Sequence, residues 1–128
     1  MNPEVLAQLE KAETSLAAAG HLLRGRFYEA AVSSAYYAMF HAAEALLEEK
    51  RLDVSSHRGV ISAIGAEFVR IGLIDRKHGR RLHIAFERRR EADYETDCKA
   101  DESSASETIN WAREFLDAAK VYLEGRSW

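Results

Sequence analysis

Apolar side chains nearly encircle one long run in the middle of the chain, residues 29–50, which contains neither Gly nor Pro. Val32, Met39 and Leu46 recur on one row at helical spacing, and Ala, Leu, Met and Glu make up much of the remainder. A helix that is apolar on all sides is typically surrounded by packing neighbours. The pattern therefore predicts a central helix over residues 29–50.

One stripe on this helix is polar. Tyr37, His41 and Glu44 follow one another at i, i+4 and i+7, so three polar groups share one face. Two interpretations stay open. The stripe is either a hydrogen-bonded network within the core, since buried polar groups need partners, or the lining of a cleft.

Polar caps and glycines delimit two further helices, which cover residues 3–24 and 57–72. The caps are Asn2 for the first, and either Ser55 or Ser56 for the second. Gly25 is expected to end the first helix as a left-handed residue, and Gly72 to end the second.

The chain after Gly72 contains two more helical patterns. Asp75 can cap a helix over residues 76–94, and Ser104 with Glu107 has the spacing of a capping box that opens the last helix. The stretch between them, residues 95–103, is acidic and lacks an apolar period, which predicts a loop.

No segment alternates apolar and polar residues as a half-buried strand does, and no internal repeat is visible. With one Pro and seven Gly in 128 residues, few positions break helices. The sequence predicts an all-α fold, an up-and-down bundle of four to five helices in a single domain, residues 1–128.

Composition narrows the function classes. Hydrophobic residues make up 47% and charged residues 30%, which is typical of a soluble globular protein. No stretch approaches the ~20 apolar residues of a membrane span, and the polar N-terminus does not resemble a signal peptide. The single Cys98 forms no internal disulfide, and no metal-ligand spacing occurs. We expect a cytoplasmic protein with no metal and no cofactor.

Charge is unevenly distributed along the fourth predicted helix and its loop. Seven of the 18 Lys and Arg fall in residues 76–90 against one acid, and residues 93–107 reverse the balance. The basic run is either a solvated helix face or a surface for phosphate groups.

Arg89 differs from its neighbours Arg88 and Arg90. It follows Phe86 by three residues and Leu82 by seven, so it projects from the face of the helix that points to the core. A guanidinium there is costly unless it is paired. Either Arg89 forms a structural bridge to Asp93, one turn on, or it is held at a cleft to bind a phosphate bidentately. Arg88 and Arg90 are expected to reach solvent more easily.

Three segments, AVSSAYYAMFHAAEALL, SSHRGVISAI and RREADY, together resemble the small stand-alone prokaryotic branch of the HEPN family. The resemblance extends over residues 11–121. It implies a bundle of four to five helices and commonly a homodimer. Many members of the family are metal-independent endoribonucleases, often toxins, with an Arg followed four to six residues later by His. Others accompany a small nucleotidyltransferase that modifies and silences them.

Carried over from the family, the arginine of this motif falls on Arg89, and the position of its histidine holds Tyr94, followed by Thr96. Tyrosine, with an ordinary pKa of about 10, is a poor base at neutral pH, but it can donate a proton or stack on a base. Asp93, Thr96, Arg88 and Arg90 are candidate binding residues beside this pair. A different histidine could serve in place of the missing one.

His41 is the histidine that we consider for this role, because Tyr37 and Glu44 on the same stripe can orient its imidazole toward a neighbouring helix. His57, His78 and His83 are expected at the surface. Two functions stay open. The chain is an RNA- or nucleotide-binding protein of the HEPN type acting as a ribonuclease through Arg89 and Tyr94. Alternatively, it is a non-catalytic helical dimer that binds a small nucleotidyltransferase, with Arg89 structural. An all-α adaptor unrelated to nucleotides is a third interpretation.

Overall fold

A computed structural model describes residues 1–94 and 100–126. Its helices are α1 (Pro3–Arg24), α2 (Tyr28–Glu49), α3 (His57–Ile64), α4 (Arg76–Tyr94) and α5 (Glu102–Glu124). A π-helical segment, η1 (Gly65–Val69), continues α3 without a break. Within the described ranges there is no strand, so the prediction of an all-α helical bundle is confirmed.

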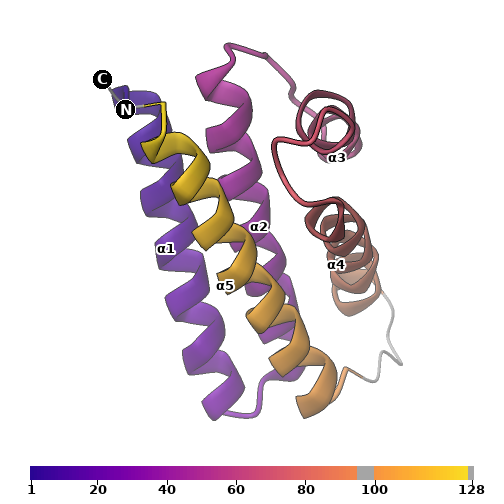
Figure 1. The fold of residues 1–128 in the computed structure, drawn as a ribbon. Coiled ribbons are helices and arrows are strands. Elements are labelled where there is room, and N and C mark those ends of the chain that lie inside the picture. Colours follow the sequence, from indigo (N-terminus) through magenta and orange to yellow (C-terminus); the bar gives the residue numbers. More distant parts are fainter. Residues whose placement is uncertain (95–99, 127–128) are drawn as a thin grey trace.

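The centre of the bundle is α2, as its apolar pattern predicts. It contacts α1, α3, α4 and α5, and Figure 1 shows α1 and α5 on one side of it and α3 and α4 on the other. In that view α1, α2 and α5 run side by side, with α1 opposite in direction, whereas α3 and α4 are seen more nearly along their axes. Antiparallel neighbours are therefore α1 with α2 and α1 with α5, whereas α2 and α5 run in the same direction and α3 and α4 cross these three helices.

Small residues allow α1 and α2 to approach closely. Ala12 and Ala19 on α1 and Ala38 on α2 are fully buried. The Ser34 hydroxyl on α2 donates a 2.8 Å hydrogen bond to the Ser15 carbonyl oxygen on α1. Ala38 lies one turn after Ser34, so it faces the same neighbour. Buried methyl groups thus form part of the packing between these two helices.

Polar side chains begin the helices, partly as predicted. Asn2 accepts a hydrogen bond from the Val5 amide at 2.8 Å, and Ser56, one of the two candidates for α3, accepts one from the Gly59 amide at 2.9 Å. The Asp75 carboxylate accepts from the Lys77 amide at 2.9 Å.

The predicted capping box of the last helix is wrong by three residues. Asp101 is the N-cap of α5, and its carboxylate accepts a hydrogen bond from the Ser104 amide at 2.8 Å. The Ser104 hydroxyl oxygen in turn accepts one from the Asp101 amide. Ser104 is therefore the third residue of the box, and Glu107 has no part in it. An Asp carboxylate caps a helix as well as a Ser hydroxyl does, and a cap three residues earlier lengthens α5 by three residues. Residues 102 and 103 consequently belong to α5; residues 95–99 of the predicted loop lie outside the described part.

The ends of the first and third predicted helices also differ from expectation. Gly25 has φ −81°, and the left-handed residue is Arg26, with φ 67°. A Cβ on Gly25 would come within 2.9 Å of the Phe27 ring, so any other residue there would have to displace this exposed side chain. The predicted helix 57–72 widens at η1, where the Arg70 amide donates to the Gly65 carbonyl oxygen at 2.9 Å. Gly72, with φ +80°, ends this segment as predicted.

None of the helices in residues 1–94 and 100–126 combines the length and apolar content needed to cross a membrane.

His78 was expected at the surface, and that prediction is wrong. Only 4% of it is exposed, its ring packs against Phe115, and its Nδ1 has no partner within the described ranges. Burial lowers the pKa of His78, and the charges of Lys77 and Arg81 lower it further. Its neutral form is thus the one that the fold accommodates.

We predict that stability falls on acidification below pH 6.5, partly because of His78. The unfolded chain then binds a proton at this side chain before the folded chain does, so stability is full above pH 6.5 and falls toward the lower folded pKa. One such group contributes a slope of up to ~1.4 kcal/mol per pH unit. Urea unfolding at several pH values between 7.5 and 5 measures it. His78→Leu should flatten the dependence; an unchanged slope would contradict this assignment.

We predict that Ala38→Leu lowers the free energy of unfolding by about 1–3 kcal/mol, because α1 leaves no room for the larger side chain. Ala30, exposed on the same helix, provides the matched control, and Ala30→Leu should change stability by less than ~0.5 kcal/mol. Urea denaturation of both variants compares them. Equal effects of the two substitutions would show that helix propensity rather than packing governs this position.

Candidate functional site

The side of α4 that holds Arg89 faces inward. Leu82, Ala85 and Phe86 are buried on this side, and only 15% of the Arg89 side chain is exposed. The inward orientation predicted from the spacing is therefore confirmed. A cation at such a position needs compensation from nearby negative or polarisable groups.

That compensation comes first from Asp93. Arg89 Nε lies 2.7 Å from Asp93 Oδ2, and Asp93 Oδ1 accepts a hydrogen bond from the Ser33 hydroxyl on α2 at 3.3 Å. The predicted bridge is present. The Nε–H bond is not aimed at the carboxylate, so the contact is an ion pair rather than a directed hydrogen bond. Within the described ranges no acceptor is bonded to the two Nη groups of Arg89, which form the other edge of the guanidinium.

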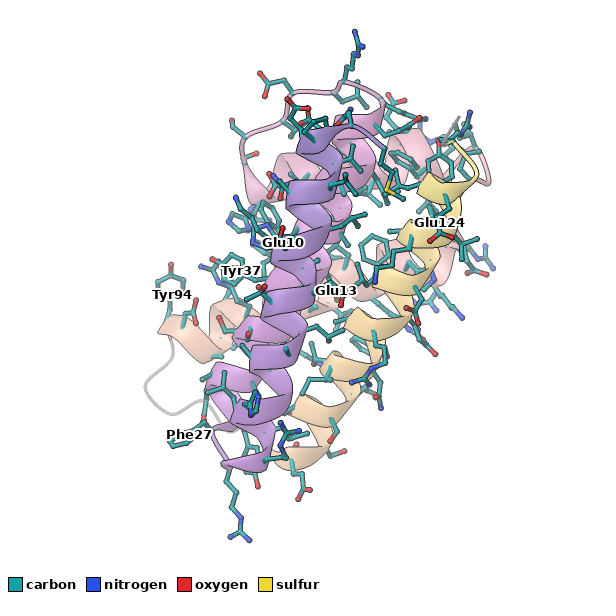
Figure 2. The ribbon with its side chains drawn as sticks, turned by 90° about the vertical axis from the view of Figure 1, so that its left-hand side faces the viewer. Glu10, Glu13, Phe27, Tyr37, Tyr94 and Glu124 are labelled. Carbon is teal, nitrogen blue, oxygen red and sulfur yellow. The ribbon has the colours of Figure 1, made fainter. Side chains whose placement is uncertain are left out.

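Two tyrosine rings flank the Arg89 guanidinium. Its carbon lies 5.2 Å from the centre of the Tyr37 ring and 5.9 Å from that of Tyr94, both within cation–π range. Figure 2 labels both tyrosines on the same edge of the molecule, Tyr37 on α2 and Tyr94 at the end of α4. Tyr94 is 74% exposed, so its ring and hydroxyl are open to a ligand.

Arg88 and Arg90 do not join this group. Arg88 turns to α5, where it pairs with Glu107 at 2.6 Å, donates to the Thr108 hydroxyl at 2.9 Å and lies over the Trp111 ring. Its side chain is 27% exposed, more than the 15% of Arg89 as expected, although it is tied to α5. Arg90, 47% exposed, reaches solvent as expected and pairs with Glu87 on its own helix.

Of the polar stripe of α2, His41 and Glu44 belong to a hydrogen-bonding network, and only His41 lines the groove beside α1. His41 Nδ1 lies 3.4 Å from Glu44 Oε1 and 3.2 Å from Gln8 Oε1 on α1, so it belongs to a network. It also borders a shallow groove of about 440 Å³ beside Lys11 and Thr14. Burial, then the charge of Lys11, lowers the pKa of His41, while burial raises the pKa of Glu44.

His57, expected at the surface, is instead half-buried in an aromatic cluster. Its Nδ1 lies 2.7 Å from the Tyr36 hydroxyl, and its ring stacks on Phe40 with centroids 4.3 Å apart. The Tyr37 and Phe86 rings lie 5.9 and 6.0 Å away. Burial lowers the pKa of His57, the Arg89 charge lowers it further, and Glu44 opposes both.

Sequence reasoning missed His57 because its partners come from other helices. The one available signal was the adjacent pair of tyrosines on the central helix: if Tyr37 is on the polar stripe, Tyr36 points into the core and its hydroxyl needs a partner. The sequence does not say which residue supplies it.

The site thus gathers Arg89, Asp93, Tyr37, Tyr94 and His57 from α2, α3 and α4. Thr96, the remaining predicted member, lies outside the described residues. A guanidinium edge without an acceptor among the described residues, beside the exposed ring of Tyr94, can bind a phosphate and stack a base. Across residues 1–94 and 100–126, no three His, Cys, Asp or Glu side chains come together in a geometry for a metal ion.

Comparison with known proteins identifies the HEPN family, the same family that the three sequence segments resemble. The family model of the HEPN domain matches residues 5–122. Over 121 residues, 94% of this chain and 90% of the relative, the chain is 41% identical to "Putative toxin MJ0605" of Methanocaldococcus jannaschii. It is 33% identical to "Putative toxin MJ0142" of the same organism, over 90% of this chain and 78% of the relative. It is also 35% identical to a "UPF0332 protein" of Thermotoga maritima, over 80% of this chain and 78% of the relative. The chain belongs to the HEPN domain family.

Proposed function

We propose that this protein binds RNA or a nucleotide at Arg89 and acts as a metal-independent endoribonuclease of the toxin type. The observation that carries the proposal is the guanidinium of Arg89. It is held inward by Asp93, lies between two tyrosine rings, and keeps an Nη edge without an acceptor in the described chain. The names of the two Methanocaldococcus relatives support the toxin class.

In this proposal Arg89 binds the phosphate next to the cleaved bond through its Nη edge. The ribose 2′-oxygen bonds to phosphorus, the bond from phosphorus to the 5′-oxygen breaks, and a 2′,3′-cyclic phosphate and a 5′-hydroxyl result. Arg89 offsets the negative charge that builds up on the phosphoryl oxygens. Tyr94 donates its phenolic proton to the departing 5′-oxygen. A water molecule takes the proton that the 2′-hydroxyl loses and passes it to Tyr94, which restores the phenol.

The non-catalytic alternative is favoured by a different observation. The Arg89–Asp93 pair already balances the charge within the protein, and Tyr94 stands where the active motif has His. In that case the chain is a helical dimer whose partner is a small nucleotidyltransferase. Homodimer formation and a cytoplasmic location are part of both proposals.

We predict that the purified protein cleaves total RNA equally with and without EDTA, and that Arg89→Ala abolishes the cleavage. Removing the cation takes away the main stabilisation of the transition state, which we expect to cost at least about 100-fold in rate. Gel analysis of RNA incubated with both proteins measures it, and mass spectrometry of the ends tests for cyclic phosphate. Cleavage that persists in the Arg89 variant comes from a contaminant or another site; no cleavage at all favours the partner role.

We predict that Arg89→Ala weakens binding of single-stranded RNA or ATP by about tenfold or more, and that Arg90→Ala weakens it by less than about threefold. Arg88→Ala should mainly lower stability, because Arg88 is tied to Glu107 and Thr108. Arg89→Lys is the matched control, since it keeps the charge but not the bidentate edge. Fluorescence titration with each ligand compares the four variants. Similar losses in all the alanine variants would indicate a diffuse charge effect rather than a site.

A further inference from the structure

The fully buried hydroxyl of Tyr36 fixes the protonation of His57. Tyr36 is 0% exposed, and its one hydrogen-bond partner within residues 1–94 and 100–126 is Nδ1 of His57, at 2.7 Å. Burial raises the pKa of this phenol, so it keeps its proton. A buried O–H group needs an acceptor, and Nδ1 is the acceptor at hand. The Tyr36 hydroxyl therefore donates, Nδ1 accepts, and the imidazole carries its proton on Nε2.

The same hydrogen bond opposes the imidazolium form. A proton on Nδ1 would face the Tyr36 hydroxyl, which would then have to turn its own hydrogen away from the only acceptor beside it. Burial and the positive charge of Arg89 act in the same direction and lower the pKa of His57. The charge of Glu44 acts against them. The side chain is thus held as a neutral imidazole with an Nε2–H donor.

His57 and Arg89 belong to one site. Both lie beside the Tyr37 ring, which is 5.9 Å from the His57 ring and 5.2 Å from the Arg89 guanidinium carbon, and the Arg89 charge acts on His57. The Phe86 ring, one turn before Arg89 on α4, is 6.0 Å from His57. Stacking on Phe40 and the bond to Tyr36 hold the imidazole in place, and the residue is only partly buried. Its Nε2 has no hydrogen-bond partner in the described chain.

We propose that His57 is the second phosphate-binding residue of the Arg89 site, and that it acts as a neutral donor through Nε2–H rather than as a base or a cation. The inference rests on the proposed function, because the ligand is the phosphate group bound by Arg89. Its chemistry is the same in a phosphodiester of RNA and in a nucleotide. Tyr36 is a positioning residue: it acts only through His57, by fixing the tautomer.

This arrangement differs from a histidine that binds phosphate as a cation. An imidazolium would lose the ligand as pH rises through its pKa, whereas a neutral Nε2–H donor is present throughout the neutral range. The groups that face His57 are Tyr36, Tyr37 and Glu44 on α2 and Arg89 on α4. Of these, Arg89 stays charged throughout, and Tyr36 stays protonated because burial raises its pKa.

Binding of two probes tests the proposal: a fluorescein-labelled 12-nucleotide single strand of 2′-O-methyl RNA, which resists cleavage by 2′-hydroxyl attack, and AMP as a competitor. His57→Phe retains the stacking on Phe40 but removes the donor, and we expect it to weaken binding of the strand about tenfold. Because that variant leaves the Tyr36 hydroxyl without an acceptor, the double variant Tyr36→Phe/His57→Phe serves as a second test with the same expected loss. His57→Gln supplies an N–H donor of similar reach and should retain most of the affinity. If AMP displaces the labelled strand, a nucleotide is sufficient for binding at this site. If AMP does not displace it, the site requires the phosphodiester.

The pH dependence gives an independent readout. In Tyr36→Phe the constraint on Nδ1 is gone, so the pKa of His57 should rise and binding should become up to about tenfold tighter at pH 6 than at pH 8. Nitrogen-detected NMR of the histidine rings should place the proton on Nε2 in the unsubstituted protein. A proton on Nδ1, or no pH effect in Tyr36→Phe, would overturn the inference.

Arg89→Ala separates the two levels of the proposal. If Arg89→Ala abolishes binding while both His57→Phe variants bind normally, the inference about His57 is wrong and the Arg89 site stands. If Arg89→Ala also binds normally, the proposed function fails and the inference fails with it. If Arg89→Ala and both His57→Phe variants lose binding while His57→Gln retains it, the result supports both the proposed function and the inference about His57.

Discussion

The ion pair between Arg89 and Asp93 is the constraint on which the site depends. A guanidinium that is 15% exposed on the inner side of α4 would be unfavourable without a carboxylate beside it. Asp93 supplies that charge one helical turn later, and Ser33 holds Asp93 from α2. The two tyrosine rings add polarisable surface on both sides. These contacts hold the cation at the junction of α2 and α4, where most of its partners are fixed before any ligand arrives.

Apolar periodicity was sufficient to predict the helices and the orientation of Arg89, because both follow from the 3.6-residue repeat along one chain segment. It failed where two local solutions compete. Asp101 and Ser104 are both good caps, and the sequence pattern does not reveal that the earlier one begins α5. The π-helical segment after α3, which contains the buried Phe68, was not predicted, because the apolar pattern does not distinguish it from an α-helix.

The histidines show the corresponding limit for the site. His57 and His78 stand among polar residues in the sequence, so they were expected in solvent. Both pack against aromatic residues of other helices: His57 contacts Phe40 and Tyr36, and His78 contacts Phe115. Sequence spacing describes neighbours within an element, whereas contacts such as these are created only when elements cross. Arg89 and Asp93 were predictable because both lie on α4; His57 was not, because its partners lie on α2.

Three consecutive arginines on α4 lie in three different surroundings. Successive residues point about 100° apart, so Arg88 meets α5, Arg89 meets α2 and Arg90 meets solvent. Arg88 and Arg81 are taken up by Glu107 and Glu114 on α5, which neutralises that side of the basic helix. The net positive charge of the run is therefore a poor guide to where an anion binds. What distinguishes Arg89 is that its carboxylate partner lies at Nε, that the Nη groups have no acceptor in the described residues, and that two tyrosine rings lie 5.2 and 5.9 Å from the guanidinium carbon.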